Sequence, residues 1–141
     1  MAKSTKTEGF TEDEREAMKE RAKEAKRGSK ADGEADLLAK VAEMTGSDKT
    51  IAERLHGIIK EVAPGLKCKT WYGMPAYTNA DGKVICFFQA AAKFKVRYAT
   101  LGFQEDAKLD DGEMWPTAYA LKALGAAEEA RIVALLKKAV G

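Results

Sequence analysis

Residues 68–89 read CKTWYGMPAYTNADGKVICFFQ, and this stretch decides the fold. It contains three short runs rich in β-branched and aromatic residues, a composition typical of strands. The residues NADG at 79–82 separate the second run from the third, and this turn-forming sequence predicts a hairpin loop. Together with 93–103 (KFKVRYATLGF) and 116–124 (PTAYALKAL), the pattern predicts an antiparallel sheet of about four to five strands.

Amphipathic helices are predicted before and after this sheet. Apolar residues recur at helical spacing over 35–44 and again over 51–62, where Thr50 and Glu53 form a capping-box pattern. Residues 126–140 predict a terminal helix, with glutamates early and lysines late. Helices, then a sheet, then a helix make an α+β fold.

The N-terminal part of the chain differs from the rest. Residues 1–9 show no apolar periodicity and are predicted to be a disordered tail. Residues 10–30 carry acidic residues three positions before basic ones and almost no apolar face, which predicts a charged helix outside the core. We expect a single α+β domain at 31–141. Because the charged helix can meet a partner or assist dimerisation, the chain is expected to be a monomer or a weak homodimer.

The composition disfavours several classes of partner. The 141 residues include 24 basic and 22 acidic side chains, giving a formal net charge of +2, so no strong one-signed field attracts nucleic acid. No apolar run approaches the length of a membrane span, and the first residues lack the apolar core of a signal peptide. These features predict a cytoplasmic protein that does not bind membranes.

The cysteines and the histidine offer no recognisable motif. Cys68 and Cys86 are too far apart for a CxxC redox pair, and both are expected to be buried as small hydrophobic residues. A disulfide between them requires their strands to lie side by side. With the lone His56 they fall short of a classical zinc-ligand set. We expect His56 to be a partly exposed helix residue without a catalytic partner.

The motif WYGMPAY at 71–77, the hairpin after it and CFFQAAAKFKVRY at 86–98 carry a family likeness. In these features residues 34–140 resemble the YdhG-like family, catalogued as domain of unknown function 1801. The resemblance implies the α+β fold of that family. Some relatives are described as frataxin-like iron chaperones, so the resemblance also permits iron binding. Where the family commonly has a histidine shortly after the lysine that matches Lys93, this chain has Phe94 and Lys95.

The ring-rich stretch at 71–77 is the first candidate site. Strand alternation places Trp71 and Gly73 on one face and Tyr72 on the other, and Gly73 and Pro75 must bend or end the strand. A bend flanked by rings can form the wall of a groove, although the same rings could fill the core.

A basic stripe is predicted in KFKVRY, the second candidate site. Alternation puts Lys93, Lys95 and Arg97 on one face, where they could bind an anion, although any half-exposed strand shows this pattern. Single-stranded nucleic acid is a less favoured ligand. The predicted ligand-binding residues are Trp71, Tyr72, Met74, Pro75, Tyr77, Lys93 and Arg97.

An acidic segment at 104–116 is the third candidate. Its carboxylates could hold a hard cation or iron(II) weakly, although a solvated loop is the favoured interpretation and the EF-hand ligand order is absent. The candidate metal ligands are Glu105, Asp106, Asp110, Asp111 and Glu113.

No catalytic motif is present in the sequence. The leading hypothesis is therefore a non-enzymatic binding domain with an aromatic and basic groove for a small ligand or a protein segment. The alternatives are a frataxin-like iron-binding chaperone and an enzyme of unrecognised type.

Overall fold

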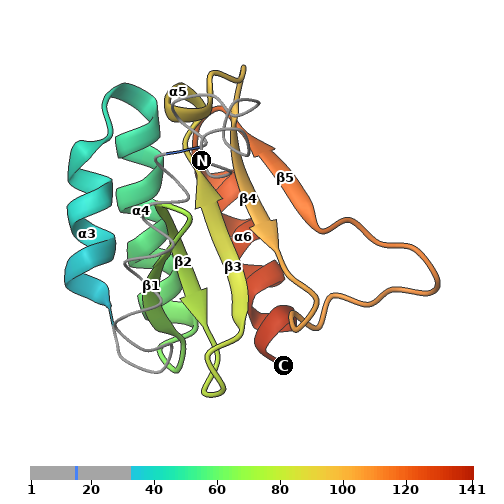
Figure 1. Cartoon of the computed structure of the whole chain (residues 1–141). Helices are drawn as coiled ribbons and strands as arrows, with labels where there is room; N and C mark the ends of the chain where they lie inside the picture. The colour runs from blue at the N-terminus through green and yellow to red at the C-terminus, as the bar shows by residue number, and fades with distance from the viewer. Residues whose placement is uncertain (1–14, 16–32) are drawn as a thin grey trace, which may run out of the picture.

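The computed structural model describes Arg15 and residues 33–141 (Figure 1). The predicted tail at 1–9 and charged helix at 10–30 lie outside the described residues, apart from Arg15. None of the helices in the described part combines the length and the apolar character that crossing a membrane requires. The elements are α3 (Glu34–Glu43), α4 (Gly46–Val62), β1 (Lys67–Trp71), β2 (Met74–Thr78), β3 (Val84–Gln89), α5 (Ala91–Phe94), β4 (Ala99–Phe103), β5 (Ala118–Leu121) and α6 (Ala126–Val140).

Five strands form one antiparallel sheet in the order β1-β2-β3-β4-β5, which confirms the predicted sheet and the α+β class. The predicted hairpin loop joins β2 to β3. In it, the side-chain oxygen of Asn79 accepts hydrogen bonds from the backbone N–H groups of Asp81 and Lys83, each at 3.0 Å. Gly82 supplies a positive φ of 80°. Local side-chain chemistry therefore sets this connection.

A two-residue turn joins β1 to β2. Trp71 pairs with Met74, and the turn residues Tyr72 and Gly73 have φ values of 53° and 78°, as a type I′ hairpin requires. The predicted alternation of these residues across one strand is wrong, because the strand ends at Trp71.

Pro75 lies inside β2, opposite Thr70, and so neither ends nor bends the strand as predicted. Proline lacks the N–H that a central strand normally donates. The pairing of β2 with β3 begins only at Ala76, so at Pro75 no ladder hydrogen bond to β3 is lost.

The three long helices, α3, α4 and α6, cover one face of the sheet (Figure 1). On that face Cys68, Tyr77, Cys86 and Phe103 form one buried row, because they are successive cross-strand partners from β1 to β4. Strand β2 separates the two cysteines by two strand spacings, roughly 10 Å. Both are free, buried thiols, as predicted.

The opposite face carries an aromatic cluster. The ring of Phe87 lies over Gly102, its partner on β4, and a Cβ atom at Gly102 would clash with that ring. The Trp71 ring meets Phe87 edge-on, with 5.3 Å between ring centroids. A side chain as large as Phe fits here because glycine stands opposite it.

The segment KFKVRY is not a strand, and the predicted basic stripe is wrong. Its first residues belong to α5, Lys95 has a left-handed φ of 56°, and β4 begins only at Ala99. The first two backbone N–H groups of α5 donate to the carboxylate oxygens of Asp48 on α4, each at 3.0 Å. The alanines at 90–92 and this cap favour a helix. Lys93 and Arg97 therefore share no strand face.

Candidate functional site

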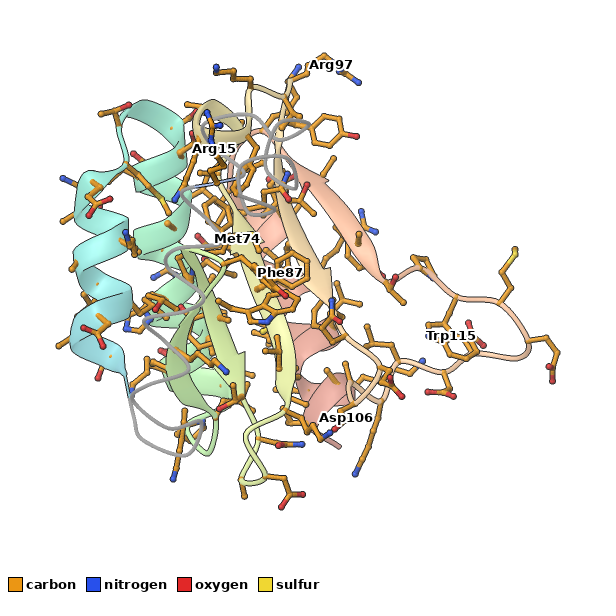
Figure 2. All side chains as sticks on the ribbon, in the orientation of Figure 1. Arg15, Met74, Phe87, Arg97, Asp106 and Trp115 are labelled. Atoms are coloured by element: carbon orange, nitrogen blue, oxygen red, sulfur yellow. The ribbon has the colours of Figure 1, made fainter. Side chains whose placement is uncertain are left out.

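The structure separates the residues predicted to form one groove. Trp71 and Met74 lie on the aromatic face, whereas Tyr77 points into the helix-covered face and contacts α4. Lys93 lines a different hollow of about 310 Å³, between the β1–β2 turn, α5 and the junction of α3 with α4. Arg97 is exposed at one end of the sheet (Figure 2).

Two more of the predicted groove residues have other roles. Tyr72 is part of the β1–β2 turn and packs edge-on against Trp71, with 5.2 Å between ring centroids. Pro75 is buried on the helix-covered side of β2. The structure thus brings Trp71 and Tyr72 together but places Lys93 in a separate hollow.

The acidic segment forms the long loop between β4 and β5. All of its five candidate ligands are exposed, and three of them line a shallow hollow of about 490 Å³ with Trp115. Within the described residues, no three of these carboxylates gather closely enough to share a metal ion. The loop candidates are Glu105, Asp106, Asp110, Asp111 and Glu113.

A different group of metal-ligand side chains does gather. Ligand atoms of Glu34, His56 and Cys68 all lie within 4.8 Å of one another. They come from the first turn of α3, the middle of α4 and strand β1. Three elements thus bring a carboxylate, an imidazole and a thiol to one point, which we call the Glu-His-Cys cluster.

A glycine sets the position of Glu34 in this cluster. The N–H of Gly33 donates to the backbone carbonyl of Cys68 at 2.7 Å, and a Cβ atom at Gly33 would lie only 3.1 Å from that oxygen. Glycine therefore permits the start of α3 to approach β1 closely. Because Glu34 follows directly, its carboxylate reaches the cysteine strand.

His56 is held from both sides. Its Nε2 lies 2.8 Å from Oε2 of Glu34, and its Nδ1 lies 2.8 Å from the hydroxyl of Tyr77. A carboxylate can only accept, so Nε2–H donates to Glu34, and in the neutral ring Nδ1 accepts from Tyr77. His56 is, as expected, a partly exposed helix residue, but a cysteine, Cys68, does lie nearby. The two bonds fix the ring between α3 and β2.

Charges and burial give the groups of the site different acidities. The hydrogen bond from His56, with nearby Lys60, holds the pKa of Glu34 below its ordinary value of 4.5. Burial raises the pKa of the Tyr77 phenol far above its ordinary value, so the hydroxyl stays neutral. Burial also raises the pKa of Cys86 to about 12. Its thiol is therefore inert near neutral pH.

The mixed donor set defines what the cluster can bind. Carboxylate oxygen, imidazole nitrogen and thiolate sulfur together suit iron(II), zinc(II) or cobalt(II), whereas magnesium and calcium prefer oxygen ligands alone. The side chain of Glu34 is 35% exposed and that of His56 is 12% exposed, so an ion can enter from the Glu34 side.

Sequence spacing gives no sign of the Glu-His-Cys cluster. Glu34 and His56 are 22 residues apart, on two helices whose relative placement depends on tertiary packing. The one signal is a polar His56 directly beside Leu55, which belongs to the apolar stripe of its helix.

The comparisons do not assign this chain to a family. The resemblance of 71–77 to the YdhG-like motif therefore stays a prediction. Searches against protein-family models, curated proteins and solved structures find no match to this chain.

Proposed function

We propose that this chain is a non-enzymatic binding domain that holds a divalent transition-metal ion, such as iron(II), as cargo at Glu34, His56 and Cys68. The observation that carries the proposal is the convergence of three different ligand types within 4.8 Å. The proposal agrees with the iron-binding role that the YdhG-like resemblance permits, but it locates the ion away from the acidic loop.

The ligand atoms must move by about 1 Å to accept an ion. A tetrahedral ion with bonds of about 2.0–2.3 Å holds its ligand atoms roughly 3–4 Å apart. The 2.8 Å between Nε2 of His56 and Oε2 of Glu34 must therefore widen by less than about 1 Å, and a separation near the 4.8 Å upper limit must shorten by about 1 Å. Three protein ligands leave a coordination position open, which favours exchange of the ion over a permanent structural role.

Proton positions also fit metal binding. When Nε2 of His56 binds an ion, the ring proton moves to Nδ1. The Nδ1–H group can then donate a hydrogen bond to the Tyr77 hydroxyl oxygen. Cys68 releases its thiol proton, so affinity rises with pH. Tyr77 is thus a positioning residue for the imidazole, and its hydroxyl serves both tautomers.

Burial favours binding over covalent catalysis. Cys68 is 0% exposed and Tyr77 is 2% exposed, so no substrate carbon can reach either nucleophile in this conformation. A small ion needs a much narrower path, which the partly exposed Glu34 side chain can provide. Because both cysteines are free thiols, we expect the protein to work in a reducing compartment, as the cytoplasm is.

An anaerobic cobalt(II) and iron(II) titration tests the proposal. Cobalt should produce thiolate charge-transfer absorption in the wild type, and Cys68→Ser should abolish it and weaken binding by at least about tenfold. Cys86→Ser is the matched control, because Cys86 lies on the same sheet face but outside the cluster. Equal binding by the Cys68→Ser variant would refute the site.

The acidic loop provides a second comparison. A triple variant with Asp110→Asn, Asp111→Asn and Glu113→Gln should bind cobalt as the wild type does. If this variant loses the metal while Glu34→Gln and His56→Gln retain it, the ion belongs to the loop and the Glu-His-Cys cluster is only a structural network.

Ligand binding in the hollow beside Lys93 is a second candidate function. The favouring observation is that Lys93 lines a hollow of about 310 Å³ together with Lys40, Glu43 and Asp48, a size suited to a small ligand. An NMR titration with a pool of small metabolites should shift residues of this hollow. Lys93→Ala should weaken the chemical-shift changes, whereas Arg97→Ala, outside the hollow, should not. An equal loss of binding in both variants would refute the hollow as the ligand site.

A further inference from the structure

The two edges of the sheet differ in how well they are protected against pairing with a strand of another chain. β1 and β5 are the edge strands. β1 carries Lys67 and Lys69, whereas β5 reads AYAL and has neither a charged residue nor a proline. Charges and prolines are the usual means by which edge strands avoid pairing with other chains. In the described part of the chain, no strand pairs with β5 on the side away from β4.

Ala118 and Ala120 direct their backbone groups toward this open edge. The N–H of Phe103 donates to the carbonyl of Thr117 at 2.7 Å, and hydrogen-bonded and non-bonded pairs alternate along antiparallel strands. Tyr119 therefore bonds to β4, while the residues on either side of it present N–H and C=O groups outward. Both alanines are also exposed, and their small side chains add little bulk beside a second strand.

An apolar hollow of about 320 Å³ lies next to this edge, between β5 and α6. Tyr119, Ile132 and Leu135 contribute to its apolar lining, and Glu128 and Arg131 on α6 add opposite charges three residues apart. If a second copy is placed across a two-fold axis, the Glu128 of each copy can face the Arg131 of the other. The hollow is thus complementary in charge to itself.

The two ends of β5 have complementary charges as well. The acidic loop at its start projects from the sheet (Figure 1), and its Met114 is 89% exposed. At the other end, Leu121 pairs with Ala99, which directly follows the exposed basic stretch KVRY at 95–98. Figure 2 shows Trp115 on the loop and Arg97 at the opposite end.

We propose that the β5 edge is the interface of a symmetric homodimer. Two β5 strands pair antiparallel, and the α6 helices lie against each other over the joined hollows. Antiparallel pairing sets the start of one strand beside the end of the other, so the acidic loop of each copy meets the basic stretch of its partner. A second copy satisfies the open backbone groups, the apolar hollow and both sets of charges at once.

Analytical ultracentrifugation of the full chain over a wide concentration range tests this interface. The wild type should shift from monomer to dimer as concentration rises. Ala120→Pro removes an N–H that points outward and leaves the hydrogen bonds between β4 and β5 intact, so proline is tolerated at this position. The substitution should raise the dissociation constant of the dimer at least about tenfold. Thermal melting checks that this variant still folds.

Charge reversal supplies an independent readout. Arg131→Glu should weaken the dimer because it repels Glu128 of the other copy, and high salt should reduce the difference. Lys137→Glu makes the same charge change on an exposed residue of the same helix and should have no effect. A wild type that stays monomeric throughout, or a folded Ala120→Pro variant that dimerises as the wild type does, overturns the proposal.

Discussion

Tyr77→Phe should lower both the free energy of unfolding and the affinity for metal. The Tyr77 side chain is buried, and its hydroxyl is 2.8 Å from Nδ1 of His56. Phe keeps the ring and its packing, so the change removes one hydrogen bond and leaves a poorly solvated ring nitrogen without its partner. The expected loss of unfolding free energy is about 1–3 kcal/mol. Loss of a group that orients a metal-binding histidine typically costs about 10–100-fold in metal affinity.

Urea denaturation and cobalt titration measure the two effects, and a double-mutant cycle assigns them. His56→Leu removes the other partner of the same bond. When both partners are replaced by apolar groups, the penalty of an unpaired group disappears. Tyr77→Phe should therefore cost clearly less in the His56→Leu background, with a coupling free energy of about 0.5–3 kcal/mol.

Two results would refute this reasoning. If Tyr77→Phe costs the same in both backgrounds, the bond to His56 does not carry the energy. If stability falls while cobalt affinity is unchanged, Tyr77 supports folding alone and does not position the imidazole.

Three further substitutions test the packing and the charges around the site. Gly102→Ala should destabilise the fold by about 1–3 kcal/mol through its clash with Phe87, and in a Phe87→Ala background it should be harmless, as urea denaturation can show. Asp48→Ala removes the acceptor of two backbone N–H groups of α5 and should cost about 1.5–3 kcal/mol, with a smaller loss for Asp48→Asn; equal stability would show that α5 needs no cap. The pKa of Glu34 in the folded protein is below its ordinary value of 4.5. The ionised carboxylate therefore stabilises the fold fully above pH 4.5, and this stabilisation is lost as the pH falls through the folded pKa. The difference in unfolding free energy between wild type and Glu34→Gln should shrink in acid, and a constant difference would contradict this.

Local sequence predicted those parts of the fold that local chemistry sets. The 79–82 loop is an example, because Asn79 and Gly82 form the turn by their own side-chain and backbone properties. The start of α4 is a contrasting case. The helix begins at Gly46, before the capping-box pattern at Thr50, whose hydroxyl instead bonds the carbonyl of Gly46 at 3.3 Å within the helix.

Distant contacts decided what the sequence pattern missed. Alternating basic and apolar residues in KFKVRY match a strand, yet Asp48 caps the segment as a helix from 43 residues away. The Glu-His-Cys cluster is likewise invisible to spacing, since α3, α4 and β1 each contribute one ligand. A binding site assembled from single residues of separate elements leaves no motif behind.

The positions of the two proposed sites make their tests independent. The Glu-His-Cys cluster lies at the β1 and β2 side of the sheet, whereas β5 is the opposite edge. In the proposed dimer, both clusters therefore face away from the two-fold axis and stay open to solvent at Glu34. Ala120→Pro should leave cobalt affinity unchanged, and Cys68→Ser should leave the dimer intact. If either substitution altered both properties, the metal and the interface would be coupled through the sheet, and the two sites could not be treated as separate.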